Sequence, residues 1–373
     1  MPASPSTGRC RSCHGVGLET IVDLGAQPDP DWLLDDASAQ PAPEAGVRLV
    51  ICPQCGLVQL AGPRPEGPRP PHGHAVSAPA GDPWVDLIVA ELGPGPKAVC
   101  GVDGSGAMPG SAFAAGGPVR QGMGDEEADL ILLGHALNHV DDLDDTLRWA
   151  EASLAPSGLI AIDFHHVLGL VRGQVDVISH AHRTYLSLLA VERALGRHGL
   201  GAVAVRRIDQ FGGTIRVLAA RHVDRDLSEP IGDAHDLRRL ERDASLDRSD
   251  GFAGVSVAIE QACDRLHEFF DSVSPDSPVV GYGASSRGTS LLNIAGIGTR
   301  SIPLVVDRAP SKQGKFLPRS MIPVGTPGDV DRLRPAYILV LPWPSAPEIS
   351  RQMGHVREWG ARFVVPLPEL RIL

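Results

Sequence analysis

Aromatic side chains are scarce in this 373-residue sequence, with Phe, Trp and Tyr making up only 4%. Proteins that bind single-stranded nucleic acid stack bases on such rings, so the scarcity argues against that class. A formal net charge of −11 also argues against sequence-independent nucleic-acid binding. No apolar run reaches the roughly 18 residues of a membrane span, and MPASPSTGRCRSC lacks the apolar core of a signal peptide. We therefore expect a soluble, cytoplasmic protein that binds neither nucleic acid nor membrane.

Cysteine is also rare, but four of the six cysteines form two C-x2-C pairs with 38 residues between them. The pairs are Cys10 with Cys13 and Cys52 with Cys55. Each pair can close a tight turn around one ion, and four thiolates complete the tetrahedral shell that zinc prefers. Zinc is favoured over disulfides in a reducing compartment, and a redox motif needs only one such pair. The spacing predicts a structural zinc ion whose four sulfur ligands leave no open position for chemistry.

The remaining sequence alternates between short apolar runs typical of strands and amphipathic stretches typical of helices. This alternation predicts an α/β fold with mostly parallel sheets. The predicted order is a small cysteine-containing module over 1–62, a Pro- and Gly-rich linker over 63–83, an α/β domain over 84–222, a charged connector over 223–249 and a second α/β domain over 250–373.

Three separated blocks of the sequence resemble one family. They read CRSC…VDLGAQP…CPQCGLVQL, then ADLILLGHALNHVDDL, then GYGASSRGTSLLN…VVDRAPSKQGKFLPRSMIPV…LVLPW…EI. Together they resemble the sugar C-methyltransferases of deoxysugar and antibiotic biosynthesis. The resemblance spans nearly the whole chain, and the ordered G-Y-G-A and K-Q-G-K-x-L-P segments are its most specific part.

The resemblance implies a fold and a reaction. The fold is a zinc-binding N-terminal module, a Rossmann-like methyltransferase domain that uses S-adenosylmethionine (SAM), and a C-terminal Rossmann-like domain. The reaction is methyl transfer from SAM to a ring carbon of a nucleotide-linked keto-sugar. In such a reaction a base removes the proton next to the ketone, and the enolate formed attacks the methyl group.

By this resemblance, two segments would hold SAM. The expected cofactor-binding residues are Gly101, Asp103, Gly104 and Gly106 in the turn VCGVDGSG, and Asn138 and His139 after a later strand. The chain departs from the family at Cys100, where an acidic residue is usual. It also has only 22 residues between Gly106 and Asp129, whereas one β-α-β unit takes roughly 30. The sequence thus predicts a shortened SAM domain without the carboxylate that usually holds the ribose.

The stretch ISHAHRTYLSL, residues 178–188, resembles the family's catalytic Y-x-E-H segment. The resemblance implies that His182 is the general base, that His180 partly replaces the lost neighbours, and that Tyr185 contacts the substrate. Two other interpretations remain open. The histidines could line a cleft without doing chemistry, or they could bind a second metal with nearby carboxylates; the residues concerned are His165, His166, His180, His182, Asp163 and Asp176.

The glycine-rich segment GYGASSRG resembles the part of the family that would hold the nucleotide of the sugar. The expected substrate-binding residues here are Gly281, Tyr282, Gly283, Ala284, Arg287 and Lys315. Glycines let backbone N–H groups approach a phosphate, and Arg287 can pair with a diphosphate. The alternative is a purely structural Rossmann repeat, and the G-x-G-x4-G spacing disfavours a dinucleotide site.

Two hypotheses follow. The first is an active SAM-dependent C-methyltransferase acting on a nucleotide-linked keto-deoxysugar. The second is a degenerate relative that binds zinc and a nucleotide-sugar, or a partner protein, without transferring methyl groups. The shortened cofactor segment separates the two, and the sequence specifies neither the sugar nor the oligomeric state.

Overall fold

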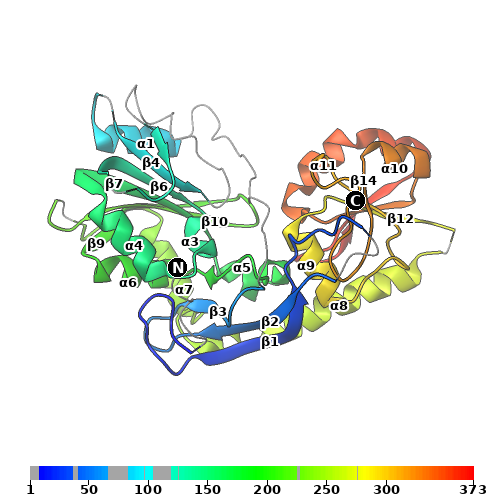
Figure 1. The fold of residues 1–373 in the computed structure, drawn as a ribbon, viewed down its shortest axis with the longest axis horizontal. Coiled ribbons are helices and arrows are strands. Elements are labelled where there is room, and N and C mark those ends of the chain that lie inside the picture. The colour runs from blue at the N-terminus through cyan, green and yellow to red at the C-terminus, as the bar shows by residue number, and fades with distance from the viewer. Residues whose placement is uncertain are drawn as a thin grey trace.

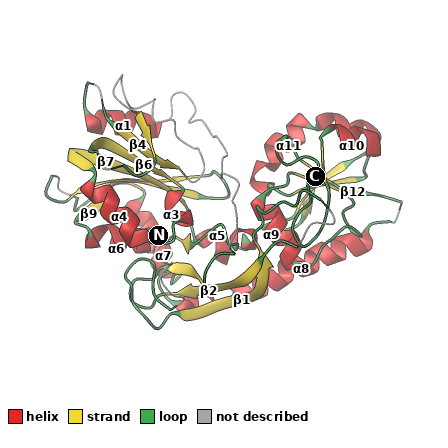
Figure 2. Cartoon of the chain, viewed as in Figure 1, coloured by secondary structure: helices red, strands yellow, loops and turns green. Residues whose placement is uncertain are grey.

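The structure is a computed structural model that describes residues 8–36, 41–65, 83–95, 97–103, 119–124, 126–224, 227–274 and 276–373. Three sheets of four, seven and six strands organise these residues. Figure 1 shows two lobes, a middle lobe around the seven-stranded sheet and a C-terminal lobe around the six-stranded sheet. Strands β1 (Glu19–Pro28), β2 (Glu44–Ile51) and β3 (Val58–Ala61) lie beneath them. Figure 2 shows helices packed around the sheet of each lobe. The predicted α/β class is confirmed.

The N-terminal sheet is antiparallel. Its strands are β1 (Glu19–Pro28), β2 (Glu44–Ile51), β3 (Val58–Ala61) and β8 (Thr184–Tyr185), in that order. The last strand comes from the middle of the chain, where Tyr185 pairs with Val58. Helix α6 (Leu188–Arg197) begins directly after this strand. The Ser187 side chain accepts a hydrogen bond from the Ala190 backbone N–H, and such a cap satisfies an otherwise unpaired donor.

The middle sheet carries the predicted strand–helix alternation. In spatial order its strands are β11 (Ile231–Gly232), β9 (Leu200–Ile208), β10 (Thr214–Arg221), β7 (Leu154–His165), β6 (Ala128–Gly134), β4 (Val99–Asp103) and β5 (Val119–Gln121). Strands β5, β4, β6 and β7 are parallel, while β10 is antiparallel to both of its neighbours. The helices are α1 (Pro83–Leu92), α3 (Ala136–His139), α4 (Leu143–Ala152), α5 (Leu168–Val171), α6 (Leu188–Arg197) and α7 (Ala234–Asp243).

Strand β6 shows why this sheet is buried on both faces. Its side chains alternate, so Leu130 and Leu132 pack in a cluster with Trp84 of α1. The intervening Ile131 and Leu133 belong to a different cluster, with residues of α4 and α6. A strand covered by helices on both faces needs a continuous apolar run, and ADLILLG provides one.

The region predicted to be shortened retains one strand. β5 pairs in parallel with β4 over three residues, so the sheet extends beyond β4 at this edge. The connection from Asp103 to Val119 lies outside the described residues, apart from those two ends. β4 therefore has β5 on one side and β6 on the other, which makes its carboxyl end the point where ligands bind in open α/β sheets.

The C-terminal sheet is parallel except for its last strand. In spatial order the strands are β14 (Val324–Gly325), β13 (Val305–Val306), β12 (Val279–Tyr282), β15 (Tyr337–Val340), β16 (Arg362–Val365) and β17 (Arg371–Ile372). Its helices are α8 (Val255–Ser272), α9 (Ser286–Ile294), α10 (Gly328–Leu333) and α11 (Ala346–Gln352). Within the described chain, no helix is long and apolar enough to cross a membrane.

The charged stretch predicted as a connector contributes to the middle lobe. Strand β11 pairs in parallel with β9, and Ala234 and Leu237 of α7 are buried in the same apolar cluster as α4 and α6. The sequence pattern hides this because α7 exposes a strongly charged face and β11 is only two residues long.

Candidate active site and zinc site

The four predicted zinc ligands converge. The Sγ atoms of Cys10 and Cys55 lie 3.5 Å apart, as do those of Cys13 and Cys52, and all four sulfurs lie within 4.8 Å of one another. A zinc ion with bonds of about 2.3 Å holds its sulfurs roughly 3.8 Å apart. Backbone N–H groups of Ser12 and Cys13 point at the Cys10 sulfur. The arrangement fits a closed, structural zinc site.

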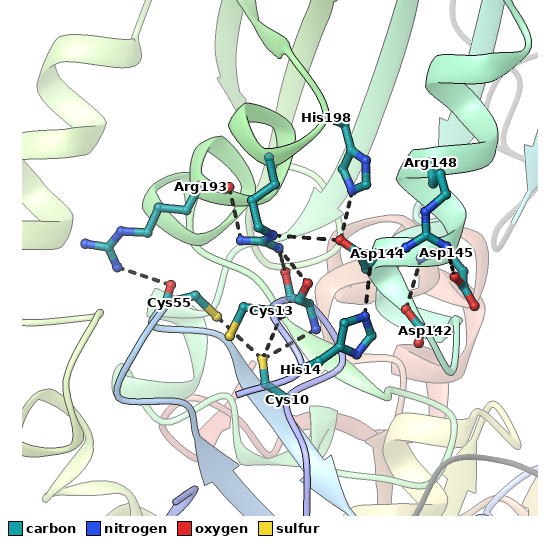
Figure 3. Close-up of polar contacts among 12 residues, drawn as sticks. Cys10, Cys13, His14, Cys55, Asp142, Asp144, Asp145, Arg148, Arg193 and His198 are labelled. Atoms are coloured by element: carbon teal, nitrogen blue, oxygen red, sulfur yellow. Dashed lines mark hydrogen bonds and ion pairs between the residues drawn. The ribbon is translucent and has the colours of Figure 1, made fainter. Parts of the chain in front are cut away.

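The turn Cys10–Cys13 of the zinc site, here called the zinc knuckle, contacts the middle lobe at Asp144 of α4 (Figure 3). This carboxylate accepts hydrogen bonds from His198 (2.9 Å) and Arg148 (2.5 Å), and it lies 3.5 Å from His14 beside the knuckle. Burial pushes the pKa of Asp144 upward, but the bonds from His198 and His14 and the charge of Arg148 outweigh it and lower the pKa. Arg193 of α6 also donates to the Cys55 carbonyl (3.1 Å).

The histidines do not form a second metal site. His180 is 1% exposed, and its Nε2 donates toward the carbonyls of Gln27 (2.8 Å) and Ala45 (3.1 Å) in the N-terminal sheet. His166 bonds the buried Glu241 at 2.9 Å. Among the described residues, only the four cysteines bring three or more metal-ligand atoms together. The second-metal interpretation is wrong because residues 179–182 form a turn, so the alternation of a strand does not apply to His180 and His182.

His182, the predicted base, lies at the carboxyl ends of the middle-sheet strands. Its Nδ1–H donates to the Val177 carbonyl at 2.9 Å, so in the neutral ring Nε2 carries the basic lone pair. Its ring lies 4.9 Å from that of His139 and 6.2 Å from that of Tyr185. The structure therefore brings together three of the residues that the sequence suggested, two of them on a shared small cavity.

This histidine cavity has a volume of about 20 Å³, room for one water molecule. It is lined by Asn138, His165, His166, Val167, Gly169, Leu170, Gln174, Val177, His182, Tyr185 and Gly213. Burial raises the pKa of Tyr185 above its ordinary value, so its phenol stays protonated and can donate a hydrogen bond.

Asn138 holds the two segments of this cavity in place. Its Nδ2 donates to the Thr184 carbonyl at 3.1 Å, and its Oδ1 accepts from the His165 backbone N–H at 3.2 Å. The side chain is buried. In this structure the amide thus braces β7 against the His182 segment, while its expected contact with SAM stays a prediction. His139, expected beside it, donates from Nδ1 to the Ala181 carbonyl at 2.7 Å.

Two histidines that were not proposed as catalytic complete the cluster. His135 follows β6 directly and His165 ends β7, so parallel pairing brings both to one edge, with ring centroids 4.4 Å apart. His165 also lies 5.4 Å from His182. Burial is the main reason that the pKa of His165 falls well below its usual value, helped by the neighbouring His135 and His182. The sequence signal was a polar residue at the carboxyl end of each buried strand.

His135 is the most constrained member of the cluster. It has a left-handed backbone (φ 53°), and its ring is 1% exposed. Neither ring nitrogen has a hydrogen-bond partner within the described chain. Burial, reinforced by His139 and Arg216, lowers the pKa of His135 to about 3. The ring is therefore neutral at physiological pH.

The expected SAM turn is described only in part. Gly101 lies within β4 and Asp103 ends it, opposite Gly134 of β6, while Gly104 and Gly106 lie outside the described residues. The Cys100 thiol donates to the Gly122 carbonyl (3.1 Å), just after β5. β5 ends at Gln121, so the residue at this strand end is not the acidic residue that usually binds the ribose. β4 lies between β5 and β6, and the carboxyl end of such a strand is where ligands bind in open α/β sheets. The contact of Gly101 and Asp103 with SAM stays a prediction.

The glycine-rich loop after β12 is closely packed. A Cβ on Gly281 would lie 2.7 Å from Val305, and one on Gly283 would lie 2.6 Å from Pro342. The Ala284 backbone N–H donates to the Asp307 carboxylate at 2.8 Å, and Tyr282 is buried in the core of this lobe. The close contacts explain why residues 281 and 283 are glycines. The Asp307 carboxylate is an anionic group that lies against the loop.

The two cations expected to bind phosphate already have partners. Arg287 forms a two-pronged contact with the buried Asp176 (2.7 and 2.9 Å), donates to the Phe211 carbonyl (2.7 Å) and lies over the Trp343 ring. Lys315 pairs with Asp35 at 3.0 Å. Their role in substrate binding remains untested. The observed role of Arg287 is to tie the C-terminal lobe to the 3-10 turn Val175–Val177, whose last carbonyl holds His182.

Comparison with known proteins supports this architecture. Family models match a zinc binding domain over residues 10–65, a methyltransferase domain over 78–205 and a C-methyltransferase C-terminal domain over 209–368. Together with the clustered cysteines, these matches define a methyltransferase-type protein with a structural zinc site. The predicted zinc site is confirmed, and the middle lobe is the domain suited to SAM.

The C-methyltransferase NovU of Streptomyces niveus is 32% identical over 249 residues. The match covers 66% of this chain and 59% of that relative, so the chain spans about three fifths of its length. The chain belongs to the three-domain C-methyltransferase family, in which the zinc-binding, methyltransferase and C-terminal domains follow one another.

Solved structures match the chain weakly. A SAM-dependent methyltransferase from Mesorhizobium loti is 12% identical, with a TM-score of 0.28, covering 37% of this chain and 96% of that one. The magnesium protoporphyrin IX methyltransferase of Synechocystis PCC 6803 is 13% identical, with a TM-score of 0.28, covering 37% of this chain and 82% of that one.

Proposed function

We propose that the chain is a SAM-dependent C-methyltransferase that acts on a nucleotide-linked keto-deoxysugar, with His182 as the general base. The observation that carries the proposal is the fixed tautomer of His182. Because its Nδ1–H is held by the Val177 carbonyl, the basic lone pair of the neutral ring is on Nε2. The ring lies 5.4 Å from that of His165, at the edge of the sheet where the other histidines meet. A general base needs this combination of orientation and a neutral ring.

Two histidines with lowered pKa values lie in the cluster around the base. Burial is the main cause of the lowered pKa values of His165 and His135, and repulsion from neighbouring cationic groups lowers them further. A neutral His165 can donate a hydrogen bond to the oxygen of an enolate, which is the charge that develops in the reaction. Bound SAM would supply the electrophilic methyl group.

The lost glutamate of the family motif has a structural substitute. The family motif has a glutamate where this chain has Ala181. Here the Val177 carbonyl orients His182 instead. The turn bearing Val177 is anchored because its Asp176 is held by Arg287 and by the Trp343 indole N–H (2.9 Å). Orientation of a catalytic imidazole by a backbone carbonyl fixes its tautomer equally well. This favours the active enzyme over the degenerate relative.

The test is turnover of TDP-4-keto-6-deoxyglucose with SAM, read by mass spectrometry. We expect a product one methyl group heavier, and loss of that product in His182→Gln. The matched control is His355→Gln, an exposed histidine paired with Asp331 in the C-terminal lobe, which should turn over normally. Deuterium uptake into the sugar in D₂O, followed without SAM, measures proton removal separately. Uptake that persists in a folded His182→Gln protein would contradict the assignment of the base.

The second candidate is the degenerate relative. It is favoured by Gln121 at the end of β5 and by the ion pairs that Arg287 and Lys315 form with Asp176 and Asp35. It predicts no heat of binding with SAM in calorimetry. Saturable binding of TDP without binding of SAM would support it and end the enzyme proposal.

A further inference from the structure

Helix α7 places a buried carboxylate, that of Glu241, beside the histidine cavity. Glu241 is 0% exposed. Its carboxylate accepts hydrogen bonds from the backbone N–H groups of Leu188 (2.6 Å) and Leu189 (2.9 Å), at the start of α6, and from the His166 ring (2.9 Å). The N-terminus of a helix favours an anion at this position. The stretch predicted as a connector therefore supplies the middle lobe with a buried carboxylate that accepts three hydrogen bonds.

His166 joins this carboxylate to the histidine cavity. Because a carboxylate only accepts hydrogen bonds, the Nε2–H of His166 is the donor, and Nδ1 carries the lone pair of the neutral ring. His166 and His182 both line the cavity, whereas Glu241 does not. The backbone of His166 is also fixed, since its N–H donates to the Gly213 carbonyl at 3.2 Å. One of the cavity histidines is thus held by a carboxylate.

The partner of His182 is different. Its Nδ1–H donates to a neutral group, the Val177 carbonyl, and its ring lies 5.4 Å from that of His165. A proton gained by His182 therefore lies close to another imidazole, whereas a proton gained by His166 lies close to the Glu241 carboxylate. An opposite charge stabilises a protonated imidazole, and a nearby cationic group destabilises it. The arrangement favours a proton on His166 over a proton on His182.

We propose that His166 accepts the proton that His182 removes from the substrate, and that Glu241 is its positioning residue. The inference rests on the proposed function, because it needs His182 as the base. The cavity of about 20 Å³ has room for one water molecule and is lined by both rings. The proton on Nε2 of His182 passes to this water, while the water gives one of its protons to Nδ1 of His166.

This transfer leaves His182 neutral while the enolate is still bound. The imidazolium formed at His166 is paired with the Glu241 carboxylate through the bond that the structure shows. Return of the proton to His182 would quench the enolate, so moving it to His166 favours attack on the methyl group. His166 then loses the proton to solvent before the next turnover.

The first test is the tautomer of His166 in Glu241→Gln. Glutamine keeps an oxygen that can accept from the backbone of α6, but it has no charge, and its amide group can donate to Nε2 of His166. The ring proton should then move from Nε2 to Nδ1, which ¹⁵N NMR of the full-length, zinc-loaded protein with labelled histidine detects. The signals that disappear in His166→Gln identify the ring. An unchanged tautomer would refute the positioning role of Glu241.

The second test is deuterium uptake from D₂O into TDP-4-keto-6-deoxyglucose, measured without SAM. His166→Gln should slow uptake by roughly 10²-fold, the lower end of what a positioned proton-transfer group contributes, and Glu241→Gln should slow it as well. The KM for the sugar should stay near that of the parent, which separates lost proton transfer from a distorted site. Glu192→Gln is the matched control, because Glu192 of α6 bonds Arg238 of α7 at 2.6 Å and neither residue lines the cavity.

The outcomes separate this inference from the proposed function. Uptake that is normal in the parent and unchanged in both variants would overturn the role of His166 but leave His182 as the base. Uptake that persists in His182→Gln and disappears in His166→Gln would make His166 the base itself and overturn the transfer between them. A parent that takes up no deuterium would contradict the proposed function and the transfer together, while the NMR result on His166 would still stand.

Discussion

The four clustered cysteines and the four histidines at 165, 166, 180 and 182 have similar sequence patterns but opposite arrangements. The cysteine sulfurs all lie within 4.8 Å of one another. The histidine rings diverge: His180 points to the N-terminal sheet and His166 to Glu241, while His165 and His182 meet over a cavity. Close spacing along the chain therefore predicts a shared site only in the first case.

The difference lies in what directs each side chain. In a C-x2-C turn, the backbone N–H groups of the turn itself point at the first sulfur, as Ser12 and Cys13 show. That geometry is complete within four residues. Each histidine instead follows an acceptor from elsewhere, such as Gln27 for His180. A local motif is thus readable from sequence, whereas a direction set by a distant partner is not.

Removal of zinc is the sharpest way to separate the two clusters. We expect Cys52→Ser, or a strong chelator, to unfold the N-terminal module, because structural zinc contributes about 10–16 kcal/mol at neutral pH. Circular dichroism during thermal unfolding measures the loss. Cys263→Ser, a half-buried cysteine outside the cluster, is the control and should change the transition only slightly. A chelated protein with an unchanged transition would refute a structural role.

Substitutions of His182 and His180 should affect different properties, turnover for His182 and stability for His180. His182→Gln should lower turnover by about 10²–10⁴-fold, the usual contribution of a general base. His180→Leu should cost about 1–3 kcal/mol of stability, because the buried carbonyls of Gln27 and Ala45 lose their donor, and leave kcat near that of the parent. Steady-state kinetics and denaturant unfolding of both variants provide the comparison. The reverse result would make His180 the base.

The histidine cluster should also make the middle lobe acid-sensitive. The folded-state pKa of His135, about 3, lies below the ordinary histidine value of 6.5, so the unfolded chain binds the proton more readily between these pH values. Stability is then full above pH 6.5 and falls as the pH drops toward 3, by up to about 1.4 kcal/mol per pH unit for each such histidine.

His135→Asn tests this, since asparagine tolerates the left-handed backbone of residue 135. Urea unfolding at several pH values between 4 and 7 should show a shallower slope for the variant. An identical slope would mean that His135 is protonated in the folded protein.

The smallest effect is expected at Lys315. Its pair with the largely exposed Asp35 should contribute about 0–1 kcal/mol, so Lys315→Gln should unfold almost like the parent. TDP calorimetry on the same variant also asks whether the glycine-rich loop binds nucleotide. A large loss of affinity would restore the substrate role that the resemblance implied.

Much of the fold could be predicted from periodicity. Buried parallel strands such as ADLILLG and the long helix α8 can be recognised because the spacing of apolar residues within each segment is typical of its structure. β8 and β11 could not be predicted, since two-residue strands exist only by pairing with β3 and β9. At the site, the spacing of the cysteines predicted the zinc ligands, and the resemblance suggested His182 as a base that stays a prediction. His135 was missed because its burial depends on Phe211 and His165.

The pairing of β8 with β3 has a consequence for synthesis on the ribosome. Strand β3 ends at Ala61, but its outer edge waits for Thr184 and Tyr185. At about 5–20 residues per second, the N-terminal sheet keeps an unpaired edge for several seconds while the middle lobe is made. Such edges invite association with other chains. Early loading of zinc would then matter as protection of a nascent chain, before any substrate is present.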